Sequence, residues 1–133
     1  FEAFLAGAVS TFIVLGAQTL FNGWAINKGI ASHTFLSFLF LAGIEEFFKF
    51  GATWIVISKN RNDFDEPVDA MIYLVVVALG FAAVENMAAA TNAGELAFET
   101  TTLRFIGATL LHTLSSGLLG YYWAFSLIKI LIF

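Results

Sequence analysis

The chain has 133 residues, of which 59% are hydrophobic and 12% are charged, and its formal net charge at pH 7 is -4. Soluble domains are about 45–50% apolar and about 25% charged, so the composition excludes an ordinary soluble domain and favours a membrane protein. The small, dispersed charge offers no basic surface to nucleic acid. The absence of cysteine excludes disulfides and Cys-ligated zinc within this sequence.

The apolar runs are continuous and about 20 residues long, which favours membrane helices over the alternating strands of about 10 residues in a β-barrel. In chain order, we expect helices over residues 4–26, 34–58, 66–90 and 102–128. The first is too long for the apolar core of a signal peptide. The sequence therefore predicts an all-α, polytopic membrane helix bundle of about four transmembrane helices, forming a single integral membrane domain over residues 1–133.

Helix ends and loops carry further signals. Pro67 is expected in the first turn of the third helix, and Thr101 and Thr102 are expected to cap the fourth. The polar segment Lys59–Glu66 is predicted to face the cytoplasm, because basic residues gather at that end of the bundle. The chain begins and ends inside apolar runs, so we expect it to be part of a longer protein.

Ionisable residues lie inside the second, third and fourth predicted helices, where each costs at least a few kcal/mol. At about 1.5 Å per residue, Glu45 and His112 lie about 16 and 15 Å from the same membrane face, and Glu85 about 8–12 Å from it. A shared polar site in that half of the membrane is predicted. Glu45 and Lys49 are expected to form an ion pair, which leaves Glu46 as an adjacent acid suited to proton transfer.

Several of these residues also have a purely structural interpretation. A single helical histidine such as His112 is more often a hydrogen-bonded core residue than a ligand. Glu85 and Asn86 alone are equally consistent with the interfacial end of a helix. Ser116, one turn after His112, is either an orienting hydroxyl or a small packing residue.

Other polar and small residues are assigned to packing. Asp69 is interpreted as structural, because it lies about 24 Å from Glu85 along a straight helix. Arg104 is expected to pair with Glu95, Glu99 or a buried acid. Gly117 and Gly120 are expected to allow a neighbouring helix to approach closely. His33 is expected in a loop without an identifiable partner, so it enters no predicted site.

The chain resembles the PrsW family of intramembrane proteases in an ordered set of motifs: Glu45-Glu46-x-x-Lys49, Asp65-Glu66-Pro67-x-Asp69-x-x-x-Tyr73, Gly80-Phe81-Ala82-x-x-Glu85-Asn86, Arg104 and His112. The family is related to the CAAX-type prenyl endopeptidases and is classed with metal-dependent peptidases. Its bacterial members are associated with extracytoplasmic cleavage of membrane-bound anti-sigma factors. Ala70 and Leu74 stand where the family often has Gly, from which we expect altered helix packing.

The resemblance implies an intramembrane endopeptidase of the bacterial cytoplasmic membrane that hydrolyses a membrane-tethered protein such as an anti-sigma factor. It makes Glu45, Glu46 and His112 the catalytic set. It adds Lys49, Glu85 and Asn86 as further site residues. A divalent metal such as zinc, if one is used, is expected on Glu45, Glu85 and His112, although no HExxH motif is present. The expected partners are membrane lipid and a membrane-anchored substrate, and not nucleic acid.

Two other functions stay open at this point. A proton-coupled transporter or channel subunit would use Glu45, Glu46, Glu85 and His112 as a proton relay. A CAAX-type processing enzyme would act on lipid-attached peptides. The CAAX-type interpretation is disfavoured by Lys49 and by the Asp-Glu-Pro segment.

Overall fold

A computed structural model describes residues 1–29, 34–59 and 64–132, and this part of the chain contains helices and turns but no strand. The predicted all-α class is therefore confirmed for these ranges. In chain order the elements are α1 (Glu2–Asn27), α2 (Phe35–Lys59), α3 (Asp69–Ala93), the 3-10 turn η2 (Gly94–Leu96), α4 (Ala97–Arg104), the π-helical turn η3 (Phe105–Thr109) and α5 (Leu110–Ile132).

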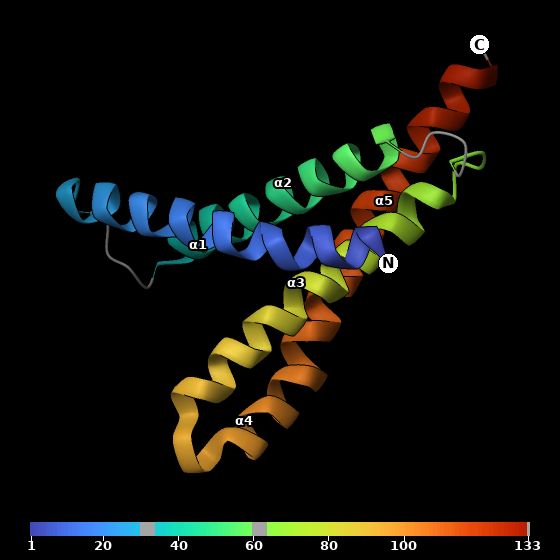
Figure 1. The fold of residues 1–133 in the computed structure, drawn as a ribbon. Coiled ribbons are helices and arrows are strands. Elements are labelled where there is room, and N and C mark those ends of the chain that lie inside the picture. The colour runs from blue at the N-terminus through green and yellow to red at the C-terminus, as the bar shows by residue number, and fades with distance from the viewer. Residues whose placement is uncertain (30–33, 60–63, 133) are drawn as a thin grey trace.

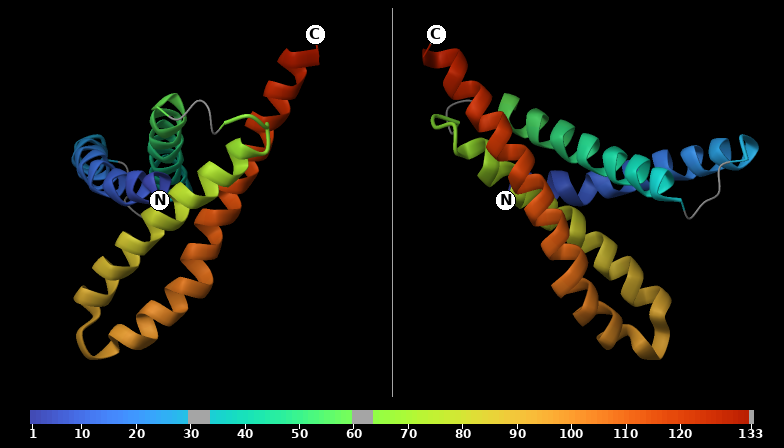
Figure 2. Two further views of the ribbon diagram at one scale, coloured as in Figure 1. Left: turned by 45° about the vertical axis from the view of Figure 1, so that its right-hand side comes forward. Right: turned by 180° about the vertical axis from the view of Figure 1, so that it is seen from behind.

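The helices form two antiparallel pairs that cross each other (Figure 1). In one pair α1 lies beside α2, and in the other α3 lies beside α4 and α5, which return along it after the η2 turn. Figure 2 shows that the two pairs meet where the first half of α1 packs on the middle of α3. The four main helices therefore converge near the middle of α3.

Glycines bring α1 and α3 into backbone contact at this crossing. A Cβ on Gly7 would lie 2.0 Å from the carbonyl oxygen of Val77, and a Cβ on Gly80 would lie 2.0 Å from that of Phe4. Only glycine fits at such distances, as is usual where small residues let membrane helices approach closely. This contact fixes the position of α1 along α3.

The packing of α3 on α5 also depends on glycine, as predicted. A Cβ on Gly120 would lie 2.7 Å from the Cα of Met71, whereas a Cβ on Gly117 would make only an ordinary van der Waals contact, at 3.5 Å, with the side chain of Val75. Ala70 and Leu74 are completely buried in α3. The expectation of close approach is confirmed for Gly120, whereas the space at Gly117 would also admit a Cβ.

The third helix begins later than predicted, at Asp69 instead of residue 66. The Asp69 carboxylate accepts hydrogen bonds from the backbone N–H groups of Asp65, at 3.2 Å, and Glu66, at 2.9 Å. These bonds stabilise a turn that contains Pro67, so the proline precedes the helix. Asp69 is thus structural, as expected. At the other end, α3 continues to Ala93 and stops at Gly94, whose φ of 57° suits glycine.

The predicted start of the fourth helix at residue 102 is wrong. The turn at Gly94 is so short that α4 already begins at Ala97. The hydroxyl of Thr102 donates to the backbone oxygen of Phe98, at 2.8 Å, inside this helix, which is the usual bond of a threonine within a helix rather than a cap. Thr101 likewise lies inside α4.

The exposed surface of the helices is strongly apolar. Phe12 on α1 is 66% exposed and Leu111 on α5 is 68% exposed. Two helical stretches of the described residues are long and apolar enough to cross a membrane, namely Glu2–Asn27 and Asp69–Ile128, of which the second comprises α3 to α5. The predicted topology of four separate spans remains a prediction, since α2 carries three ionisable residues in its middle.

Two predictions fall outside the described residues. His33 lies in the range 30–33, and the middle of the predicted cytoplasmic loop lies in the range 60–63. The structure therefore does not bear on them.

Candidate active site

His112 lies at the centre of a polar cluster where α2, α3 and α5 meet. Its Nδ1 is 3.8 Å from Oε2 of Glu45, and its Nε2 is 3.0 Å from Oε2 of Glu85. The sequence predicted that these three residues from three different helices share one layer, and their proximity is confirmed. The cluster also contains Lys49, whose Nζ is 3.1 Å from Nδ1 of His112.

These contacts assign the proton of the His112 ring. The ammonium group of Lys49 can only donate a hydrogen bond, so Nδ1 of His112 accepts it. The ring proton is then on Nε2 and is donated to Glu85. The edge of the ring also packs against Phe81, with centroids 5.3 Å apart. His112 is thus oriented from both sides.

Lys49 pairs with Glu46, and the predicted ion pair with Glu45 is wrong. The side chain of Lys49 is completely buried, and its Nζ is 2.6 Å from Oε1 of Glu46. Residues three apart on a helix are neighbours as well as residues four apart, so spacing alone does not choose between the two acids. The ammonium group also lies 4.9 Å from the centre of the Phe81 ring.

Two serines on α5 complete the contacts of Glu46. The hydroxyl of Ser115 donates to Oε1 and that of Ser116 donates to Oε2, each at 2.8 Å. Both carboxylate oxygens of Glu46 are therefore engaged. Ser116 orients this carboxylate, which was one of its two expected roles. Ser115 was missed, although its position three residues after His112 places it on a neighbouring part of the same helix face.

Glu45 is less constrained than Glu46. Its Oε1 accepts a hydrogen bond of 2.9 Å from Nε2 of Gln18 on α1. Its Oε2 faces His112 at 3.8 Å, which is beyond hydrogen-bonding distance. The sequence analysis missed Gln18, and the signal that could have found it is a polar amide in a helix otherwise suited to lipid.

Arg104 supports the opposite side of the cluster. Its NH2 group donates to Oε2 of Glu85 at 3.3 Å, and its Nε donates to Oδ1 of Asn86 at 3.1 Å. The amide of Asn86 in turn donates to the hydroxyl of Thr109 at 2.9 Å. The expected pairing of Arg104 with a buried acid is confirmed, and Glu85 and Asn86 do more than mark the end of a helix.

The π-helical turn η3 aligns Arg104 with His112. The two residues are eight positions apart, which in a regular α-helix leaves them about 80° apart around the axis. A π-helical turn accommodates one extra residue, so eight positions rotate about the helix axis by about as much as seven positions of a regular α-helix. The directions of the two side chains around the axis then differ by only about 20°. Both can therefore reach Glu85, as their distances of 3.3 and 3.0 Å require.

Two cavities open onto the cluster from different sides. One, with a volume of about 340 Å³, lies between α2 and α5 and is lined by Glu46 and apolar side chains. The other, with a volume of about 230 Å³, is lined by residues of α1, α3 and α4 that include Glu85 and Arg104. The site is thus accessible from an apolar side and from a charged side.

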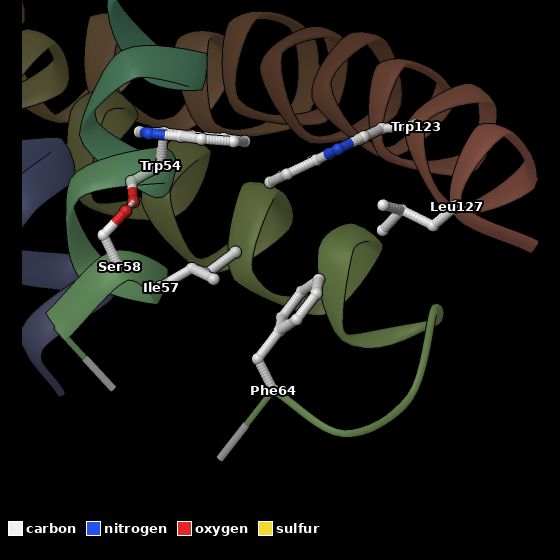
Figure 3. A pocket seen from close by; sticks show the side chains of 6 residues that line it. All are labelled: Trp54, Ile57, Ser58, Phe64, Trp123 and Leu127. Carbon is white, nitrogen blue, oxygen red and sulfur yellow. Dashed lines mark hydrogen bonds between the residues drawn. The ribbon is translucent and has the colours of Figure 1, made fainter. Parts of the chain in front are cut away.

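A third cavity of about 340 Å³, shown in Figure 3, contains no ionisable residue. It is lined by Trp54, Ile57, Ser58, Phe64, Trp123 and Leu127. The ring centroids of Trp54 and Trp123 are 6.0 Å apart, and Trp123 stacks on Phe64 at 6.1 Å. Aromatic clusters near helix ends are typical of membrane interfaces, so this cavity is assigned no chemistry.

The predicted metal ligands have suitable chemistry but unsuitable positions. Glutamate oxygens and an imidazole nitrogen are ordinary zinc ligands. However, Nδ1 of His112 faces the ammonium group of Lys49, and Nε2 donates to Glu85, so neither nitrogen is free to bind a cation. In residues 1–29, 34–59 and 64–132, no group of three or more His, Cys, Asp or Glu could hold a metal ion. The arrangement of Glu45, Glu85 and His112 therefore does not fit a metal.

The chain is similar to known proteins over nearly its whole length. Residues 1–129 match the model of the PrsW family, described as intramembrane metalloproteases. The chain is 31% identical to the protease PrsW of Geobacillus kaustophilus and 28% identical to that of Clostridioides difficile, in each case over 90% of this chain and 50% of the relative. It is 36% identical to the protease PrsW of Oceanobacillus iheyensis over 65% of this chain and 38% of the relative.

The chain spans about half the length of the first two of these relatives. No solved structure matches it. The family match includes α1, so it covers Gln18 as well as the motifs that follow. The chain belongs to the PrsW family of intramembrane metalloproteases.

Proposed function

We propose that the full-length protein is an intramembrane endopeptidase that hydrolyses a peptide bond of a membrane-tethered protein in the bacterial cytoplasmic membrane. The observation that carries this proposal is the pair formed by Glu45 and His112, with a partly free carboxylate 3.8 Å from an oriented imidazole. The carboxylate of this pair can activate water, and the ammonium group of Lys49 beside the imidazole can stabilise the charge that develops on a peptide carbonyl. Membership of the PrsW family supports the same activity.

In this proposal Glu45 is the general base. Gln18 fixes one carboxylate oxygen, at 2.9 Å, and leaves Oε2 able to accept a proton from water. The resulting hydroxide attacks the carbonyl carbon of the scissile peptide bond. The proton on Glu45 then passes to the leaving amine, so that the carboxylate is regenerated.

In this proposal Lys49 stabilises the oxyanion, and Glu46 and His112 are positioning residues. The charge of Lys49 is 3.1 Å from the His112 ring and is held there by Glu46 at 2.6 Å. In an apolar environment such a fixed charge stabilises a developing negative charge strongly. Glu85 and Asn86 orient His112 and Arg104 from the other side.

The substrate is proposed to be an apolar segment of a membrane-anchored protein such as an anti-sigma factor, cleaved from the extracytoplasmic side. The apolar cavity beside Glu46 supports this choice, since Phe47, Phe50 and Leu119 line it. Its volume of about 340 Å³ suits apolar side chains. The 133 residues are proposed to act as one membrane-embedded unit, with the loop over residues 59–66 in the cytoplasm and lipid around the helices.

The test uses the full-length protein in liposomes with a panel of single-span substrates. Glu45→Gln should reduce cleavage by about 10²–10⁴-fold, because the amide keeps the shape and loses the base. Glu46→Gln should also impair cleavage, through displacement of Lys49. The matched control is Glu95→Gln, which changes an exposed acid in η2 and should retain full activity. Full activity of both site variants would contradict the proposal.

Two further measurements in the same liposomes separate the alternatives. Cleavage that survives a chelator agrees with the engagement of both His112 nitrogens by Lys49 and Glu85. Cleavage that is lost with the chelator and restored by zinc would require His112 to leave these partners and bind the metal. A pH-sensitive dye inside the liposomes tests for proton transport. Proton flux without cleavage of any substrate would favour the transporter over the protease.

A further inference from the structure

Hydrolysis at membrane depth requires water, and one cavity of the described structure is lined by a charged pair. This cavity has a volume of about 230 Å³ and is bordered by α1, α3 and α4, with Glu85 and Arg104 in its wall. We propose that it is the route by which water enters the site. The inference rests on the proposed protease function, but its central test does not depend on activity.

The occupant of the cavity follows from the charges that border it. The side chains of Glu85 and Arg104 are 20% and 34% exposed and lie 3.3 Å apart. Charged groups left partly uncovered at membrane depth are strongly unfavourable in hydrocarbon and normally face water or protein. Lipid tails cannot satisfy the remaining donors of Arg104, whereas water can. Although Phe12, Leu15 and Val84 also line the cavity, the charged pair in its wall favours water over lipid tails.

The shape of the cavity connects the site with the end of the bundle. On α3 it is lined by Glu85, Ala88, Ala89 and Asn92. These positions form one stripe about 10 Å long that leads toward the turn at Gly94. The two alanines leave room that larger side chains would fill, and a volume of 230 Å³ accommodates several water molecules at about 30 Å³ each.

The inner end of the route reaches Glu85, which contacts His112. Glu85 accepts the Nε2 proton of His112 at 3.0 Å, and the other ring nitrogen, Nδ1, lies 3.8 Å from Oε2 of Glu45. The cavity next to Glu46 lies between α2 and α5 and is otherwise apolar. Water and substrate would thus reach the site from different sides, and an apolar substrate segment would not block the supply of water.

Cysteine labelling tests the route directly, in a Cys-free version of the full-length protein in liposomes. Ala89→Cys places a thiol in the cavity wall, and Met87→Cys places one at a similar depth on a side chain that is 69% exposed and outside the wall. A charged methanethiosulfonate reagent, added to both membrane faces, should modify Ala89→Cys about tenfold faster or more, because only hydrated thiols ionise and react. Equal, slow modification of both variants would overturn the proposal.

A second pair of variants links the route to catalysis. Ala89→Leu should lower kcat several-fold with little change in KM, since it restricts water without touching the substrate side. Met87→Leu, outside the cavity wall, should change neither constant. An unchanged kcat in Ala89→Leu would contradict the route.

The outcomes of the two proposals are distinguishable. Rapid labelling of Ala89→Cys in a protein that cleaves no substrate supports the hydrated cavity and contradicts the protease function. If the protein cleaves its substrate efficiently but Ala89→Cys is labelled no faster than Met87→Cys, the result supports the protease function and contradicts the water route.

Discussion

Replacing Lys49 by Met tests the electrostatics at the centre of the site. The Lys49 side chain is completely buried, and its ammonium group contacts Glu46 at 2.6 Å and His112 at 3.1 Å. Met has a similar length but no charge. The Glu46 carboxylate would retain only its serine donors, so we expect the protein to become less stable.

The structure gives the expected magnitude. Removing one partner of a buried ion pair costs about 3–5 kcal/mol. Glu46 keeps two serine hydroxyls and its side chain is 26% exposed, so the loss should lie at the lower end, about 3 kcal/mol. In Lys49→Met combined with Glu46→Gln the uncompensated charge is gone. The double variant should therefore recover about 2 kcal/mol relative to the sum of the single variants.

The measurement is the free energy of unfolding of the four proteins, titrated with sodium dodecyl sulfate in mixed micelles. Lys28→Met is the control, since Lys28 is exposed at the end of α1, and it should change stability by less than about 0.5 kcal/mol. Additive effects of Lys49→Met and Glu46→Gln would refute the reasoning, because independent residues show no coupling energy.

Three further predictions concern the helices around the site. Gly7→Ala should destabilise the protein by about 1–3 kcal/mol in the same titration, because its Cβ would overlap the α3 backbone at 2.0 Å. The control Gly16→Ala has nothing within 4 Å of the new Cβ, so it should be neutral or slightly stabilising. Gln18→Leu should lower kcat for peptide hydrolysis about tenfold, since the Glu45 carboxylate that Gln18 orients becomes mobile. An unchanged kcat would contradict this role of Gln18. Ser115→Ala and Ser116→Ala should each cost about 1.5–3 kcal/mol, as expected for hydrogen bonds to a charged group, and unchanged stability of both would contradict the assigned bonds.

The sequence alone determined the helical class and the layer in which the site lies. Long apolar runs require helices in a membrane, because the backbone must satisfy its own hydrogen bonds there. The constant rise of a helix then placed Glu45 and His112 at one depth before their contact was known. Close packing at Gly120 was also predictable, since small residues in membrane helices commonly mark contact sites.

Local hydrogen bonds decided where the helices begin, and sequence patterns did not. Asp69 binds the N–H groups of residues 65 and 66 and delays the start of α3 past Pro67. Gly94 permits a turn so short that α4 starts before Thr101. Asp69 and Gly94 are residues of types that suit caps and turns, but several competing caps and turns are compatible with the same residues.

The partners within the site were decided only by the tertiary structure. Lys49 can reach an acid three or four residues earlier with equal ease, and the serines of α5 bring Glu46 to it. The π-helical turn changes which residues of α5 share a face with Arg104. Gln18 reaches Glu45 because α1 packs along α2. Helical rise fixes depth along the chain, whereas rotation about each axis follows from interhelical packing, which involves residues far apart in sequence.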